Sequence, residues 1–134
     1  MIAIDTNVLV RFVVDDDHEQ ADRAEALLRA NQVLIPRTVL LESEWVLRSR
    51  YRCGREAIGA LLEMLLSTEN LVVEAADQVE QALRWYRLGA DFADALHLAA
   101  CGTATMHTFD KSFCEAAVRA GVAPPVNVIG VGER

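Results

Sequence analysis

The sequence predicts an α/β fold, a three-layer α/β/α sandwich with a central parallel sheet of about five strands. Short apolar runs alternate along the chain with longer segments whose apolar residues recur at helical spacing. Strands that alternate with helices form parallel sheets, and such sheets are covered by helices on both faces. The chain has 134 residues, of which 52% are hydrophobic, so we expect a single domain, residues 1–134, with a substantial core.

The first half of the chain begins with a short buried strand at 1–4, followed by apolar residues at helical spacing over 6–14. We interpret the run Asp15–Asp17 as the N-cap and first-turn charge of a second helix, in preference to a metal site. Three further elements complete this half: a strand at 33–35, a helix from the N-cap Thr38 to about Tyr51, and an amphipathic helix at 58–66.

The second half continues the alternation with a strand at 71–74 and a helix at 76–88, for which Gly89 is a natural C-cap. Asp91 is the expected N-cap of the next helix, which runs to Cys101 and is almost wholly apolar. The remaining expected elements are a strand at 106–108, a helix at 113–120 and a strand at 126–129.

Cysteine spacing and the length of the apolar runs argue against a disulfide-rich protein, a zinc site and a membrane-spanning helix. The three cysteines are widely separated and match no metal-binding or disulfide spacing, so we expect free thiols. No apolar run approaches the roughly 20 residues of a membrane-spanning helix, and no signal peptide is recognisable, so we expect a cytoplasmic protein.

The net charge of −7 argues against broad electrostatic attraction to a nucleic-acid backbone. It does not exclude a nucleic-acid enzyme, because acid concentrated at a metal site can coexist with a local basic patch. The candidate patch is a group of arginines around Tyr51: Arg48, Arg50, Arg52 and Arg55.

Four acids occur at comparable places in the predicted fold. Asp5 and Asp110 directly follow strands, whereas Glu42 and Asp94 lie in the first turns of helices. All four can converge on the carboxyl edge of a parallel sheet, where sites of such folds usually lie. Carboxylates brought together raise one another's pKa and need a proton, a cation or a cationic side chain to hold them. A cage of carboxylates suits Mg²⁺ or Mn²⁺, and its natural chemistry is phosphodiester hydrolysis.

For Asp91, Glu44 and His97 we favour structural roles over metal binding. Asp91 reads as an N-cap, and Glu44 projects about 200° around its helix from Glu42. His97 lies one turn after Asp94 and could pair with it or pack; we do not favour it as a metal ligand. Asp94 is harder to explain structurally, because a carboxylate on a buried apolar helix is costly unless something compensates it.

At four places the sequence resembles the acidic motifs of PIN-domain ribonucleases, in the family's order. The matching segments are Ile4–Leu9, Leu41–Leu47, Asp91–Ala99 and Thr108–Phe113. Each motif alone is weak, but four in order with compatible spacing are specific. The resemblance extends from end to end of the chain, and its small size is similar to that of the VapC toxins of toxin–antitoxin pairs.

The resemblance implies a function and a set of site residues. Asp5, Glu42, Asp94 and Asp110 match the family's metal-binding acids, and Thr6, Asn7 and Thr108 match polar residues that orient those acids. The implied activity is Mg²⁺- or Mn²⁺-dependent cleavage of single-stranded RNA, with a metal-activated water attacking in line. The implied partners are a cognate antitoxin, which covers the acidic pocket and inserts an arginine, and a second copy of the chain. Apolar residues on the helices at 38–52 and 55–66 are the expected contacts.

Two alternatives remain at this point. A phosphoryl-transfer domain with an acidic pocket would also be α/β, but Asp5-Thr6-Asn7 lacks the second aspartate of a D-x-D motif, and Lys111 directly follows Asp110. A non-catalytic module that binds RNA or protein through the same fold is the other alternative, against which the complete set of acids argues.

Overall fold

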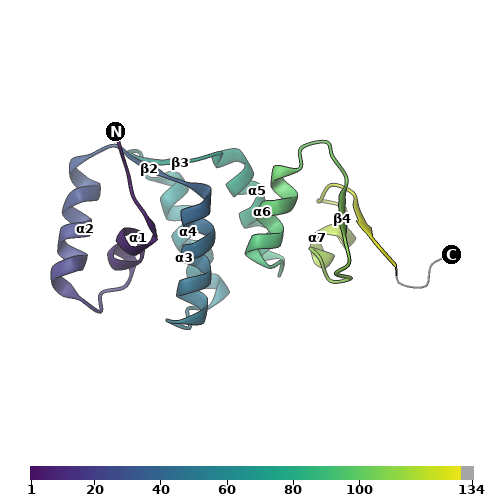
Figure 1. Ribbon diagram of the computed structural model, residues 1–134, viewed down its shortest axis with the longest axis horizontal. Helices are drawn as coiled ribbons and strands as arrows, with labels where there is room; N and C mark the ends of the chain where they lie inside the picture. The colour runs from purple at the N-terminus through teal and green to yellow at the C-terminus, as the bar shows by residue number, and fades with distance from the viewer. Residues whose placement is uncertain (131–134) are drawn as a thin grey trace. The chain divides into compact units, whose positions relative to one another are not determined.

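The computed structural model describes residues 1–130, and the chain divides into two compact units, Met1–Ala76 and Asp77–Arg134 (Figure 1). The last four residues lie outside the described range. Among the helices within that range, none has the length and apolar character needed to cross a bilayer.

The first unit contains a three-stranded parallel sheet in the order β1-β2-β3. Its strands are Ile2–Ala3, Val33–Ile35 and Leu71–Val73. In the register of β2 and β3, Val33 lies opposite Leu71 and Ile35 lies opposite Val73. All four of these side chains are buried, which is the period-two pattern of a sheet face that packs on the core.

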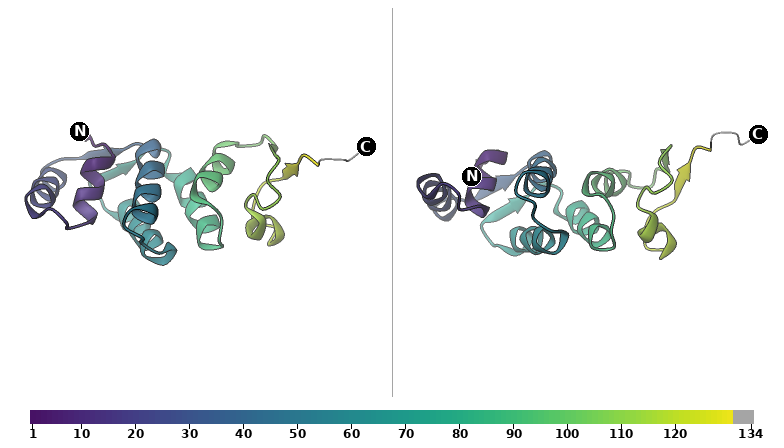
Figure 2. Two further views of the ribbon diagram at one scale, coloured as in Figure 1. Left: turned by 60° about the horizontal axis from the view of Figure 1, so that its bottom comes forward. Right: turned by 90° about the horizontal axis from the view of Figure 1, so that it is seen from below.

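Four helices complete the first unit. Helix α1 (Thr6–Val13) packs against α2 (His18–Ala30) and α3 (Arg37–Ser49), and α4 (Arg55–Ser67) packs against β3. Helices α3 and α4 lie on opposite sides of the strands (Figure 2, right). Their inward side chains, including Leu40, Leu47, Ile58 and Leu65, are almost fully buried.

The second unit combines three helices and a two-stranded parallel sheet. The helices are α5 (Ala76–Arg87), α6 (Phe92–Ala100) and α7 (Glu115–Arg119), and the strands are β4 (Met106–Thr108) and β5 (Val126–Val128). Its core is aromatic. The rings of Tyr86 and Phe92 meet edge to face at 5.5 Å, and the indole N–H of Trp85 donates to the Val122 carbonyl oxygen at 3.3 Å.

The structure confirms the α/β class, the five strands and their parallel pairing, and it corrects several details. The strands form one sheet of three and one of two, where a single sheet of about five was expected. Thr38 is not an N-cap, because α3 already begins at Arg37 and Pro36 is the cap. The expected helix at 113–120 is shorter, since Cys114 has a left-handed backbone with φ of 48° and α7 begins after it.

Gly89 ends α5 as the sequence predicts. Its φ is +108°, a conformation that side chains with a Cβ rarely adopt. The N–H of Gly89 bonds to the Tyr86 carbonyl and that of Ala90 to the Trp85 carbonyl, each at 3.0 Å. This is the double hydrogen bond of a Schellman motif, which satisfies the last carbonyls of the helix.

We predict that Gly89→Ala lowers the free energy of unfolding by about 1–2 kcal/mol, because the left-handed conformation becomes strained. The matched control is Gly54→Ser at the N-cap of α4, where an added Cβ meets nothing within 4 Å. Serine at that cap should be neutral or slightly stabilising. Urea unfolding followed by circular dichroism measures both variants, and equal stability of Gly89→Ala and the parent would contradict the prediction.

Candidate functional site

Asp5 lies at the junction between β1 and α1, as the sequence predicts. Its backbone is extended, and its carboxylate accepts the N–H of Val8 at 3.2 Å, so it is the N-cap of α1. The side chain is otherwise exposed, whereas Ile4 before it and Thr6 after it are buried. A buried strand end and a buried helix start therefore hold an exposed carboxylate in a defined place.

Thr6 connects this junction to the second acid. Its Oγ1 donates a hydrogen bond to the Glu42 Oε1 on α3, 36 positions further along the chain. Thr6 is only 8% exposed, so its hydroxyl has little freedom to turn elsewhere. The contact brings the first and second motifs together within the first unit. It is the kind of bond that an orienting role requires, although that role remains a prediction.

Asn7 is exposed in the first turn of α1 and lines a groove of about 300 Å³ between α1 and α2. The groove has an apolar floor that includes Val8 and Leu27, and its polar lining includes the side chains of Arg11 and Arg23. The predicted role of Asn7 in orienting an acid remains a prediction.

Asp91 and Asp94 occupy the start of α6. The Asp91 carboxylate accepts the N–H of Asp94 at 3.0 Å, which confirms Asp91 as the N-cap. Asp94 follows in the first turn, flanked by the buried Phe92 and Ala95. The N-cap bond therefore holds the Asp91 carboxylate at the backbone of Asp94, within the first turn of α6.

Asp110 lies in a tight turn that directly follows β4. Its backbone N–H donates to the Thr108 Oγ1 at 3.0 Å, and its carboxylate accepts both the N–H of Ser112 at 2.9 Å and the Ser112 hydroxyl at 2.7 Å. Thr108 thus fixes the backbone of Asp110, whereas Ser112 fixes its carboxylate. Sequence reasoning missed Ser112, although an Asp followed two residues later by Ser is a recognisable Asx-turn pattern.

The acids of the second unit influence one another's protonation. Burial raises the pKa of Asp94, and the charges of Asp91 and Asp110 raise it further, while His97 has the opposite effect. Hydrogen bonds from Ser112 lower the pKa of Asp110. Burial, with the same three aspartates adding to it, raises the pKa of the Cys114 thiol to about 11. Negative charge is therefore concentrated around Asp94 without full compensation.

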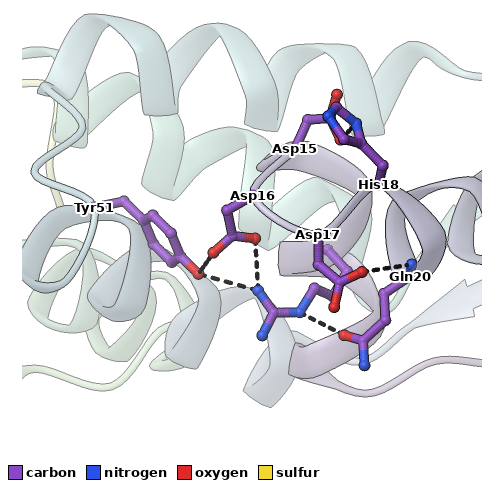
Figure 3. Close-up of polar contacts among 7 residues, drawn as sticks. Asp15, Asp16, Asp17, His18, Gln20 and Tyr51 are labelled. Carbon is purple, nitrogen blue, oxygen red and sulfur yellow. Dashed lines mark hydrogen bonds and ion pairs between the residues drawn. The ribbon is translucent and has the colours of Figure 1, made fainter.

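Three other acids have structural partners, as the sequence reading favoured (Figure 3). Asp17 caps α2 by accepting the N–H of Gln20 at 3.1 Å, and Asp15 pairs with His18 at 2.8 Å. Asp16 accepts hydrogen bonds from the Tyr51 hydroxyl at 2.9 Å and from the Arg11 guanidinium at 2.7 Å. These bonds lower the pKa of Asp16, the bond from Tyr51 most strongly.

Glu44 is a buried carboxylate that the sequence reading also left outside the site. It is 3% exposed, and its Oε2 pairs with the Nε of Arg48 at 2.9 Å, one turn along α3. Arg48 therefore compensates a buried charge in α3. Of the candidate basic patch, Arg50 and Arg52 are exposed and make no ion pair within residues 1–130.

The proposed metal ligands fit a hard divalent cation by their chemistry. All four are carboxylates, and oxygen ligands are those that Mg²⁺ and Mn²⁺ prefer. Asp5 and Glu42 belong to the first unit, and Asp94 and Asp110 belong to the second. Across residues 1–130, no group of three or more His, Cys, Asp or Glu side chains is arranged to hold a metal ion. The negative charge around Asp94 is the feature of the chain that would most favour binding of a cation.

Comparison with known proteins identifies the family of the matched segment. The family model described as PIN domain matches residues 2–119, a segment that contains all four acids and the three polar residues beside them. No curated protein matches the chain.

We predict an energetic coupling between Thr6 and Glu42, because a hydrogen bond to a carboxylate contributes about 1 kcal/mol or more when one partner is buried. A double-mutant cycle of Thr6→Val and Glu42→Ala, measured by urea unfolding, should give a coupling free energy of about 1 kcal/mol. Thr6→Ser keeps the hydroxyl and should retain the coupling. Strictly additive effects of the two substitutions would show that the contact contributes nothing.

We predict that Asp94→Asn stabilises the metal-free protein at neutral pH. Because the pKa of Asp94 is raised in the folded state, folding stability falls as pH rises above the ordinary aspartate pKa. The variant removes this loss, so its advantage of at most about 1 kcal/mol at pH 7 should vanish near about pH 3.

The matched control for this prediction is Asp110→Asn, which should behave in the opposite way. The lowered pKa of Asp110 means that its charged form supports the fold, and this support is lost as pH falls. Unfolding curves with EDTA at several pH values measure both variants. Destabilisation by Asp94→Asn at pH 7 would contradict the prediction.

Proposed function

The chain belongs to the PIN domain family, whose members are typically metal-dependent nucleases, and from this premise we propose that it is an endoribonuclease that cleaves single-stranded RNA. The observation that carries the proposal is the placement of the four acids. Asp5 and Asp110 each lie two residues beyond a strand of a parallel sheet, and Asp94 lies in the first turn of α6. Glu42 lies in the second turn of α3, not in the first turn as expected, because the helix already begins at Arg37. Such positions are where α/β proteins present catalytic groups.

We propose that residues 1–134 form a single domain. The family match supports this, because it continues through the boundary between Ala76 and Asp77. Asp5, Glu42, Asp94 and Asp110 are the proposed ligands of Mg²⁺ or Mn²⁺. When bound, the divalent cation activates a water for in-line attack and neutralises charge that develops on the phosphate oxygens.

Hydrogen bonds within the chain hold three of the four proposed ligands in place. The N-terminus of α1 holds Asp5, Thr6 holds Glu42, and Ser112 and Thr108 hold the carboxylate and backbone of Asp110. Bonds of this kind fix the direction in which a carboxylate offers its free oxygen. Asn7 is the remaining proposed orienting residue. Burial and the charges of Asp91 and Asp110 raise the pKa of Asp94, whereas a nearby cation favours the charged form of a carboxyl group.

We further propose that the protein is the toxin of a type II toxin–antitoxin pair, that it acts in the cytoplasm as a homodimer, and that a cognate antitoxin inhibits it. The antitoxin would cover the acids and insert an arginine among them. Partners that bind α3 and α4 would meet the apolar side chains that are exposed on these helices. Leu62 and Leu65 are buried in the core, whereas Trp45 and Met64 are the exposed large apolar side chains on these helices.

The decisive experiment is incubation of the protein with a mixed pool of single-stranded RNA and Mg²⁺ or Mn²⁺. We expect cleavage that EDTA abolishes and that Asp5→Asn and Asp94→Asn reduce by at least about 100-fold, because each removes a metal ligand. Asp15→Asn is the matched control, since Asp15 pairs with His18 and lies outside the four motifs.

Equal activity in the parent and the two ligand variants, or no cleavage by the parent, would overturn the nuclease proposal. Binding of RNA without cleavage would instead favour a non-catalytic module. A gain in mass after incubation with a phosphoryl donor would favour a phosphoryl-transfer domain.

A further inference from the structure

Two aromatic side chains are exposed among residues 1–130, and each lies beside a proposed metal ligand. Trp45 is 52% exposed and follows Glu42 by three positions on α3. Phe109 is 73% exposed and directly precedes Asp110. The remaining aromatic residues of the described chain are buried or half-buried. Single exposed apolar residues are common on protein surfaces, but here both aromatic ones coincide with the acidic motifs.

Trp45 belongs to an exposed stripe along α3. Thr38, Glu42, Trp45 and Ser49 are spaced by four, three and four residues, which places them on one side of the helix, and all four are exposed. Three residues of helix rise by about 4.5 Å, so the indole lies within one turn of the Glu42 carboxylate. The stripe leads toward Arg50 and Arg52 at the end of the helix.

Phe109 is held by the hydrogen bonds of its neighbours. The Asp110 N–H bonds to the Thr108 hydroxyl on one side of it, and Ser112 bonds to the Asp110 carboxylate on the other. The ring therefore projects from a backbone that is fixed on both sides. An aromatic side chain on such a backbone has only two rotatable bonds, so it loses little conformational freedom when a flat ligand stacks on it.

The charge of the chain decides what kind of contact can hold RNA here. With a net charge of −7, the protein gains little general attraction for a phosphate backbone. Stacking of bases on aromatic rings needs no positive charge, tolerates any sequence and is a main source of affinity for single strands. It is also unavailable to a duplex whose bases are already stacked.

We propose that Trp45 and Phe109 are base-stacking residues that hold single-stranded RNA at the acids beside them. This inference rests on the proposed nuclease function and adds to it the contacts that select single strands. An antitoxin that covers the same exposed rings would exclude RNA directly.

The test uses the full chain carrying Asp94→Asn, which permits binding without cleavage, and a fluorescently labelled single-stranded oligoribonucleotide with Mg²⁺. In this background, Trp45→Ala and Phe109→Ala should each raise the dissociation constant by about 5- to 150-fold. Trp45→Phe and Phe109→Trp keep an aromatic ring and should stay within about 3-fold of the background protein. Leu88→Ala removes an exposed apolar side chain outside the motifs and outside α3 and α4, and is the matched control.

Tryptophan fluorescence supplies a second readout. Trp85 is 1% exposed and should not respond to RNA, so quenching on RNA addition reports Trp45. Quenching should disappear in Trp45→Phe although binding persists.

Unchanged dissociation constants in both alanine variants, while the parent still cleaves RNA, would overturn this inference alone. A change in self-association without a change in RNA binding would assign the rings to a protein interface. Failure of the parent to bind or cleave RNA would overturn the nuclease proposal as well.

Discussion

Repulsion between carboxylates is the constraint on which the candidate site depends. Three of the four acids in the motifs have a hydrogen-bond donor of their own: the N–H of Val8 for Asp5, the Thr6 hydroxyl for Glu42, and Ser112 for Asp110. Within residues 1–130, no donor reaches the Asp94 carboxylate, which also has the charges of Asp91 and Asp110 nearby. Apart from the effect of His97, the fold therefore leaves the charge of one acid of the set without compensation. In a metal-dependent enzyme, a bound cation would supply that compensation.

Much of the fold could be predicted because its signals are local. The alternation of short apolar runs with helical patterns predicted every strand and helix that the structure contains, often to within a residue or two. The N-caps Asp17 and Asp91 and the C-cap Gly89 were predictable because a short side chain or a missing Cβ acts on its own backbone.

Other details depend on contacts that no local pattern contains. Neither the left-handed conformation of Cys114 nor the start of α3 at Arg37 follows from local propensity. The hydrogen bond from Thr6 to Glu42 joins residues that are 36 positions apart, and only the fold brings them together. The motifs identify the acids and the polar residues Thr6, Asn7 and Thr108, but only the fold determines which acid Thr6 contacts. The contact of Ser112 with Asp110 is local, because an aspartate commonly accepts a hydrogen bond from the backbone two residues further on.

The position of Cys114 also determines how readily its thiol reacts with oxidants. The thiolate is the form of cysteine that peroxides and disulfides attack, and a thiol with a pKa of about 11 is almost wholly protonated at neutral pH. The side chain is also buried, so oxidants in solution have little access to it. The carboxylates around Asp94 that would hold a cation contribute to keeping this thiol chemically inert. Under oxidative stress, we therefore expect Cys53 and Cys101, which are half-buried, to be oxidised before Cys114.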